Sequence, residues 1–320
     1  MKKVLTSLFF VMSAMGTSAL AQDYPIKPIR LIVPASPGGT TDIAARMIAE
    51  PLGKALGQSV VVENKPGAAG KIAAQQVLRS PADGYTLLLQ YSGFQVITPS
   101  VEKVSWDPVE DFTPIANVLS APQVLVVKKD LPVKSLSELV GYAKEHPNKL
   151  NYASSGNGAL QHVATEKLNQ LAGIKTTHVP YKGTGPALTD LLAGLIDFTI
   201  TTPPPLLAHI KSCSIKALVV TDNKRLDSLP EVPSAPEAGY PDLIVSSWFA
   251  MYGPKDLPEE VVKKLSSAIE KIMQSKEYRE KAAQQGADAA YLNPQELKQY
   301  TADELKKWKQ VIDAAGIKTQ

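Results

Sequence analysis

The chain has 320 residues, of which 44% are hydrophobic and 20% are charged, and its formal net charge is +3. This balance excludes a disordered chain and a protein with many membrane spans, and the absence of a basic stripe argues against a nucleic-acid partner. The single cysteine, Cys213, excludes an internal disulfide framework and a cysteine cluster for metal, and we expect it to be buried as a small apolar side chain.

The first 21 residues have the pattern of a secretory signal peptide. Lys2 and Lys3 precede an apolar stretch, and Ala19-Leu20-Ala21 has the form of a cleavage site. The apolar stretch is shorter than the ~20 residues that a membrane span needs. We therefore expect cleavage between Ala21 and Gln22 and a soluble protein in a bacterial periplasm.

The next part of the chain alternates between short apolar runs and amphipathic helices. Strands are predicted at 29–33, 60–62 and 85–90, and helices at 43–56, after helix caps at 40–42, and at 72–78. Pro51 should kink or shorten the first helix, and Gly57 should end it. The nearly unbroken apolar run at 85–90 is typical of a parallel sheet that is covered on both faces.

A second set of strands and helices begins near residue 123. Strands are predicted at 124–127, 150–153, 176–179, 198–201, 215–220 and 245–252. Helices are predicted from the capping box Ser135–Glu138 to residue 145, and at 159–172 and 186–193. Three further amphipathic helices, at 258–274, 276–285 and 294–314, complete the chain. The alternation predicts an α/β fold of about two domains.

Motifs for cofactor, metal or catalytic chemistry are missing. No P-loop, dinucleotide fingerprint, nucleophile elbow or H-E-x-x-H sequence occurs, so we expect no cofactor and no metal. An exported serine hydrolase stays open as the alternative function, with Ser154 or Ser155 as nucleophile and His162 or His178 as base. A serine–histidine contact with an orienting acid would support it.

One structural device recurs four times: a strand runs into a loop of Gly, Ser, Thr or Pro, and a helix follows. The loops are 35–40, 64–70, 154–158 and 182–185. Helix N-termini present free N–H groups and partial positive charge, and such loops lie at the carboxyl ends of parallel strands, where ligands bind. The repetition therefore predicts a site for a small carboxylate or phosphate.

Short motifs along the whole chain resemble the Bug-type solute receptors of tripartite tricarboxylate transporters. They are Val33–Asp42, Val62–Gly70, Asp83–Leu87, Asn151–Gly158, Val179–Gly183, Leu229–Pro233, Glu237–Gly239 and Ser247–Phe249, in collinear order. The resemblance implies a type II periplasmic-binding-protein fold, with two doubly wound lobes and a ligand cleft between them. Lobe 1 would comprise residues 22–121, completed by about 221–320, and lobe 2 residues 122–220.

The resemblance also implies a function without chemistry: capture of a small organic carboxylate and delivery to the membrane permease. A receptor that must close around its solute is expected to be a monomer. Asp42 would organise the helix start rather than touch the anion. The ligand-binding residues implied for lobe 1 are Ser36, Pro37, Gly38, Gly39, Thr40, Tyr91, Ser92, Gly93 and Phe94. Those implied for lobe 2 are Ser154, Ser155, Asn157, Gly158, His162, Thr184, Gly185 and Thr202.

The chain departs from the family pattern in ways that bear on the ligand. Relatives commonly have an aromatic residue where this chain has Ala35, and a different loop where it has Tyr91–Phe94. Tyr91 and Phe94 could form an aromatic wall, to which Trp248 would add unless it belongs to the core, which we favour for it. An aromatic carboxylate such as terephthalate is therefore a candidate beside aliphatic di- and tricarboxylates.

Overall fold

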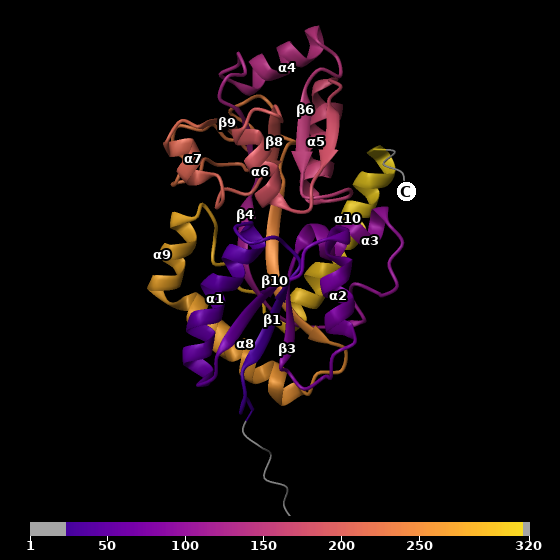
Figure 1. The fold of residues 1–320 in the computed structure, drawn as a ribbon, viewed down its shortest axis with the longest axis vertical. Coiled ribbons are helices and arrows are strands. Elements are labelled where there is room, and N and C mark those ends of the chain that lie inside the picture. The colour runs from indigo at the N-terminus through magenta and orange to yellow at the C-terminus, as the bar shows by residue number, and fades with distance from the viewer. Residues whose placement is uncertain (1–23, 316–320) are drawn as a thin grey trace, which may run out of the picture.

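The computed structural model describes residues 24–315, so the predicted signal peptide and its cleavage site lie outside the described residues. The described chain forms two lobes, each built on a five-stranded sheet with helices around it (Figure 1). This confirms the predicted two-lobe α/β architecture. Between residues 24 and 315, no helix combines the length and the apolar character needed to cross a membrane.

Lobe 1 is built on a sheet with the strand order β2-β1-β3-β10-β4. Its strands are β1 (Ile29–Val33), β2 (Val60–Asn64), β3 (Thr86–Tyr91), β4 (Phe112–Pro122) and β10 (Ser246–Pro254). Its helices are α1 (Thr40–Leu56), η1 (Ala68–Gly70), α2 (Lys71–Leu78), η2 (Gly93–Ile97), α3 (Thr98–Val101), α8 (Glu259–Gln274), α9 (Lys276–Gln284) and α10 (Pro294–Ala315). All six residues of β3 are buried, as expected for a central strand.

Lobe 2 is built on a sheet with the strand order β7-β6-β8-β5-β9. Its strands are β5 (Val124–Lys128), β6 (Asn151–Ser154), β7 (Thr177–Pro180), β8 (Phe198–Thr201) and β9 (Ile215–Val220). Its helices are α4 (Leu136–Glu145), α5 (Leu160–Ala172), α6 (Thr184–Leu192) and α7 (Leu207–Lys211). The predicted strands and helices of this lobe are confirmed to within a few residues.

The parallel sheet predicted from the strands at 29–33, 60–62 and 85–90 is confirmed, because β1 pairs in parallel with β2 and β3. One strand in each lobe runs in the opposite direction. β10 is antiparallel to both β3 and β4, and β5 is antiparallel to both β8 and β9. The physical reason is the path of the chain. Each of these strands enters its lobe from the other lobe, on the side where the parallel strands end, and it must therefore run against them.

The first helix is not shortened by Pro51, because this proline lies inside α1 and the helix continues to Leu56. Ile48 and Leu52 on either side of the proline are fully buried. We attribute the continuity of the helix to this packing, which compensates for the backbone hydrogen bond that proline cannot donate. Gly57 ends the helix in the left-handed conformation, as predicted.

Two parts of lobe 1 and one residue of lobe 2 were not anticipated. The long strand β4 was not predicted, and the expected loop at 91–94 instead starts the one-turn helix η2, which runs directly into α3. Cys213 is exposed and has a positive φ of 54°, so the prediction that it is buried is wrong.

Two crossing segments join the lobes at Gln123 and between β9 and β10. Thr221 donates its backbone N–H to the Gln123 carbonyl over 2.8 Å, and its hydroxyl bonds to the Val245 carbonyl over 2.7 Å. The Gln123 backbone N–H in turn lies 3.2 Å from the Val245 carbonyl oxygen. The strands are thus tied to one another at the crossing. The exact lobe boundaries that the sequence suggested stay a prediction.

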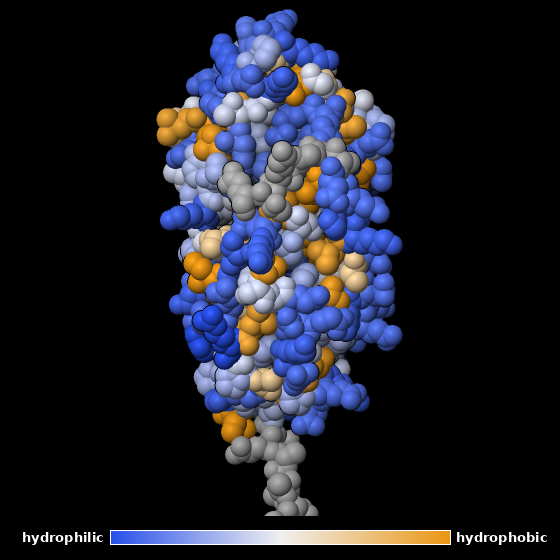
Figure 2. All heavy atoms as spheres, turned by 90° about the vertical axis from the view of Figure 1, so that its right-hand side faces the viewer, coloured by the Kyte–Doolittle hydropathy of each residue, from blue (hydrophilic) through white to orange (hydrophobic). Residues whose placement is uncertain are grey.

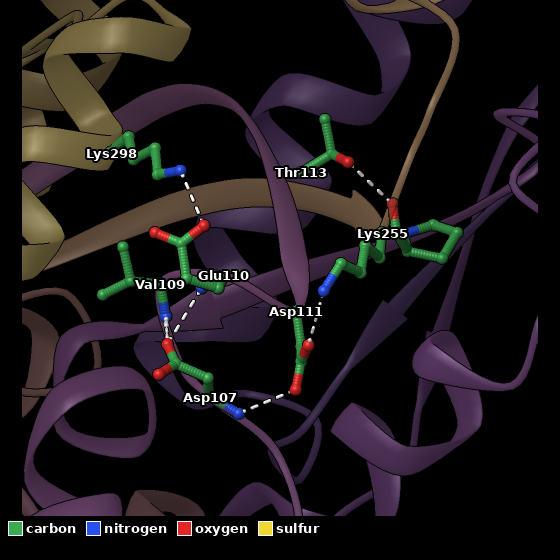
Figure 3. A network of polar contacts seen from close by, with 8 residues as sticks. Asp107, Val109, Glu110, Asp111, Thr113, Lys255 and Lys298 are labelled. Atoms are coloured by element: carbon green, nitrogen blue, oxygen red, sulfur yellow. Dashed lines mark hydrogen bonds and ion pairs between the residues drawn. The ribbon is translucent and has the colours of Figure 1, made fainter.

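The C-terminal helices return to lobe 1 and are fastened there by a polar network (Figure 3). Lys255, directly after β10, forms an ion pair with Asp111 at 3.1 Å, and Lys298 of α10 pairs with Glu110 at 2.9 Å. The Asp107 carboxylate accepts the backbone N–H groups of residues 109 and 110 and so shapes the turn that carries both acids. Ion pairs this exposed add little stability, and we take their role to be positional.

Candidate functional site

A small cavity lies between the lobes, where strand ends and helix starts meet. Its volume is about 20 Å³, little more than one water molecule occupies, so a larger ligand requires the lobes to separate. Lobe 1 contributes Ala35, Gly39, Thr40, Thr41, Tyr91, Phe94, Ser247 and Phe249, and lobe 2 contributes Ser155, Gln161, Gly183, Thr184 and Thr202. These lining residues include no charged side chain.

The N-termini of α1 and α6 reach the cavity from opposite lobes without a side-chain cap. Gly39 and Gly183 occupy the N-cap positions, and neither helix receives a side-chain hydrogen bond there. The first N–H groups of a helix have no partner within it and carry its partial positive charge. An anion between Thr40 and Thr184 would therefore meet N–H donors from both lobes.

Asp42 shapes the loop that precedes α1, consistent with the helix-organising role that the sequence suggested. Its carboxylate accepts the Gly38 N–H at 3.0 Å and the Asn64 amide at 3.0 Å, and forms an ion pair with Arg46. Burial raises the pKa of Asp42, but the hydrogen bonds from Arg46, Gly38 and Asn64 outweigh it and lower this pKa below its usual value. A charged Asp42 thus holds residues 35–39 without lining the cavity.

The loops of the two lobes touch at one edge of the cavity. The Ser36 hydroxyl donates to the Lys182 carbonyl at 3.1 Å, and the Thr40 and Thr202 hydroxyls are hydrogen-bonded to each other. A Cβ on Gly183 would make only an ordinary contact, 3.5 Å from Ser36, but the φ of this residue is 125°, a backbone conformation that favours glycine. Two of the anion-binding loops predicted from sequence therefore meet across the lobes.

Tyr91 of lobe 1 reaches the N-terminus of α5 in lobe 2. Its hydroxyl accepts the Leu160 backbone N–H at 2.9 Å and donates to Gln161 Oε1 at 3.2 Å. Its ring stacks on Phe249, with centroids 6.1 Å apart, and meets Phe94 edge-on at 4.8 Å. Burial raises the pKa of Tyr91 to about 12, so its hydroxyl keeps its proton at neutral pH.

Gln161 organises the lobe 2 side of the cavity and was missed by the sequence analysis. Its Oε1 also accepts the Ser155 hydroxyl at 2.8 Å, while its amide nitrogen faces Thr184 and Thr201 at 3.4 and 3.3 Å. Ser247, Phe249, Thr41 and Gly183 were likewise not singled out as ligand contacts. Gln161 could have been found from its place in the first turn of a helix that follows a Gly/Ser loop.

Ser154, His162 and His178 form a separate cluster behind the cavity lining. The His162 and His178 rings are stacked with centroids 3.9 Å apart, and the Tyr152 ring stacks with His178 at 4.9 Å. Ser154 Oγ lies 2.6 Å from His178 Nε2. Burial, and secondarily the neighbouring His162, lower the pKa of His178 to about 3.

This cluster contains the serine–histidine contact expected of a hydrolase, but it lacks two other parts. Ser154 is only 1% exposed, so a substrate cannot reach its hydroxyl in this conformation. The nearby Glu166 carboxylate accepts from Tyr152 and Asn169, and no carboxylate of the described residues is hydrogen-bonded to His178. The geometry therefore gives a buried polar contact rather than a triad.

The remaining predicted site residues lie around the cavity rather than on its lining. They are Ser36, Pro37, Gly38, Ser92, Gly93, Asn157, Gly158 and Gly185, with Trp248, which is buried and packs against Tyr300. Gly93 lies under Tyr91, and Gly70 of the 64–70 loop lies under Phe94. Between residues 24 and 315, no three His, Cys, Asp or Glu side chains come together as metal ligands.

Comparison with known proteins agrees with this architecture. Residues 44–317 match the family described as "Tripartite tricarboxylate transporter family receptor". The chain is 36% identical to protein BugT of Bordetella pertussis (strain Tohama I / ATCC BAA-589 / NCTC 13251), over 97% of this chain and 96% of that protein.

Solved structures with the same fold include the periplasmic binding protein BugD. It shares 34% identity, covers 93% of this chain and all of its own, and superposes with a TM-score of 0.88. An R. palustris protein solved with adipate has a TM-score of 0.91 at 35% identity, and covers 93% of this chain and all of its own.

Proposed function

The chain belongs to the receptor family of the tripartite tricarboxylate transporters, and on this premise we propose that it captures a small organic carboxylate between its lobes and hands it to a membrane permease. It would act in the periplasm, as a monomer, after removal of the leader at residues 1–21. The family consists of solute receptors, so binding and release, without turnover, are the activity to test.

The observation that carries the proposal is the pair of uncapped helix N-termini at the cavity. The starts of α1 and α6 face one space from the two lobes, at Gly39–Thr41 and Gly183–Thr184. Since the lining has no charged side chain, these N–H groups and the threonine hydroxyls are the donors that an anion would use. A phosphate is compatible with the same donors, and the relative that was solved with adipate supports a carboxylate.

The body of the ligand would contact aromatic rings. Tyr91, Phe94 and Phe249 all line the cavity, whereas Trp248 lies behind it. This supports the candidacy of an aromatic carboxylate beside aliphatic acids. The rings provide apolar surface to either kind of ligand, so a binding experiment is needed to distinguish aromatic from aliphatic acids.

Capture requires the lobes to open and close about the crossing segments. Closure on a ligand needs an affinity that is higher in the closed state, and donors from both lobes meeting one anion would provide it. Gln123, Thr221 and Val245, which are hydrogen-bonded to one another where the segments cross, are the proposed hinge.

Isothermal titration calorimetry of the purified protein tests the proposal. The panel would contain butanoate, succinate, hexanoate, adipate, citrate, benzoate, terephthalate and inorganic phosphate. We expect saturable 1:1 binding of at least one carboxylate, and a melting temperature that rises with its concentration. Binding of phosphate alone, or of no member, would contradict the carboxylate assignment.

Delivery to a permease needs a test in cells. A deletion strain should lose uptake of the acid that the protein binds, and the gene supplied in trans should restore it. Figure 2 shows one side of the molecule, where blue hydrophilic residues predominate and orange ones are scattered. On this face, permease contact would therefore be mainly polar, and uptake rather than stable complex formation is the suitable measurement.

The Ser154–His178 contact is the one observation that favours the alternative, an esterase-like hydrolase. A 2.6 Å contact is within the range of a catalytic pair. The low pKa of His178, however, makes it a weak base, and the burial of Ser154 keeps a substrate away from its hydroxyl. We expect no hydrolysis of p-nitrophenyl acetate above a Ser154→Ala variant; turnover that this variant loses would revive the alternative.

A further inference from the structure

Three helix N-termini converge on the interlobe cavity, and one differs from the other two. The starts of α1 and α6 have no side-chain cap. The 13-residue helix α5 also lacks a cap from its own N-cap residue, Ala159. Its first N–H, that of Leu160, is instead satisfied from the opposite lobe by the hydroxyl of Tyr91 at 2.9 Å. The Tyr91 hydroxyl oxygen therefore occupies the position beside the Leu160 N–H that a ligand oxygen would otherwise take.

We propose that Tyr91 makes the site selective for ligands with a single carboxylate, because its hydroxyl occupies the helix end that would receive a second one. The inference rests on the proposed function and names the ligand class of the same cavity. The first carboxylate would bind between α1 and α6, and the remainder of the ligand would lie against Tyr91, Phe94 and Phe249.

Gln161 Oε1, which accepts the hydrogen bond from Tyr91, is also fully occupied by hydrogen bonds within the protein. Gln161 Oε1 receives hydrogen bonds from Tyr91 and Ser155, and its amide nitrogen faces two threonine hydroxyls. The lining contains no Lys, Arg or His that could pair with another anion. A second carboxylate would therefore lose its hydration against aromatic rings without gaining a partner, which is unfavourable.

The packing around Tyr91 fixes the hydroxyl in this position. The ring is held between Phe249 and Phe94, and Tyr91 is only 5% exposed. A Cβ on Gly93 would lie 2.0 Å from the Tyr91 hydroxyl, so this residue has to be glycine for the side chain to follow its path. The packing therefore fixes Tyr91 as a permanent part of the cavity wall.

The test compares affinities within pairs of equal carbon skeleton: butanoate with succinate, hexanoate with adipate, and benzoate with terephthalate. For the wild-type protein we expect the monocarboxylate of the best-bound pair to bind at least as tightly as its partner. Tyr91→Leu keeps apolar packing but opens the α5 end, and should shift the ratio toward the dicarboxylate by about tenfold or more.

Further variants separate the hydroxyl from the ring and from general effects. Tyr91→Phe removes the hydroxyl but keeps the space filled, and should shift the ratio less than Tyr91→Leu. Tyr91→Ala replaces Tyr91→Leu if circular dichroism shows that the leucine variant does not fold. Tyr142→Ala on α4, which takes no part in the cavity lining, is the matched control and should leave the ratio unchanged.

The outcomes distinguish this inference from the proposed function. A wild-type protein that binds a dicarboxylate more than about tenfold tighter than its partner in every pair overturns the inference alone, as does a ratio that Tyr91→Leu and Tyr91→Ala leave within about threefold. A wild-type protein that binds citrate but none of the six paired acids overturns the inference and leaves the proposed function standing. A wild-type protein that binds no carboxylate of the panel overturns the proposed function and the inference with it.

Discussion

The N-termini of α1 and α5 have the same sequence pattern but different environments in the fold. Each follows a buried strand and a glycine-containing loop, and neither has a side-chain cap from its own N-cap residue. The α1 terminus opens on the cavity, whereas the first N–H of α5, that of Leu160, is paired with the Tyr91 hydroxyl from the other lobe. A helix start is thus an anion site only where the rest of the fold leaves its N–H groups unpaired.

The largest effect that would test this comparison is expected from placing an anion at α1. Gly39 has φ −77° and ψ 161°, a normal N-cap conformation, and a Cβ there would lie 3.4 Å from the Ser36 carbonyl. Gly39→Asp should fit, cap the helix and lower ligand affinity by about 100-fold through competition for the same donors. Calorimetry measures this.

The matched control for that variant is Gly39→Ala, which adds the Cβ without a carboxylate and should lower affinity far less. The melting temperature of the aspartate variant should stay constant or rise, since an N-cap contributes about 1 kcal/mol. Equal loss of affinity in both variants would mean that the loop shape, not its N–H donors, binds the ligand.

A second prediction concerns the glycine beneath Tyr91. In Gly93→Ala the new methyl group would meet the Tyr91 hydroxyl at 2.0 Å, so the free energy of unfolding should fall by about 1–3 kcal/mol. Gly141→Ala, inside α4 with nothing within 4 Å of the added carbon, should instead raise it by about 0.5–1 kcal/mol. Urea unfolding of both variants measures the contrast, and equal changes would show that Tyr91 is free to move aside.

A third prediction isolates the cross-lobe hydrogen bond. Tyr91→Phe leaves the buried Leu160 N–H without its partner and should lower the free energy of unfolding by about 1 kcal/mol. Tyr300→Phe, at a tyrosine that is 38% exposed, serves as the control and should change it little. No loss in Tyr91→Phe would indicate that water replaces the hydroxyl in solution.

Near neutral pH the smallest effect is expected from protonation, in the part of lobe 2 behind α5. His178 has its pKa lowered from 6.5 to about 3, so between these values the unfolded chain binds more protons than the folded one. Unfolding should therefore become easier as pH falls through this window. Thermal melts of the wild type, His178→Gln and the control His209→Gln measure the effect, and only His178→Gln should flatten the pH dependence.

Most of the secondary structure was predictable because it depends on local patterns. Residues close together in the sequence determine the apolar run of β3, the caps at Ser135 and Gly57, and the amphipathic C-terminal helices. Pro51 misled the prediction because packing on the sheet, which depends on distant residues, outweighed a local preference. β4 and the antiparallel direction of β5 and β10 were missed because strand pairing depends on where the chain crosses between lobes.

By itself the sequence determined the two-lobe α/β class, the family and the loops that start α1, α5 and α6, since these follow from local periodicity, glycine placement and collinear motifs. Only the tertiary structure decided which of those loops keep free donors. It brought Tyr91 to Leu160, 69 residues away, and placed Gln161, Ser247 and Phe249 on the cavity. It also placed the His162–His178 stack behind the cavity lining. The physical reason is that a hydrogen-bond donor is available or used according to what packs against it, and those partners come from distant parts of the chain.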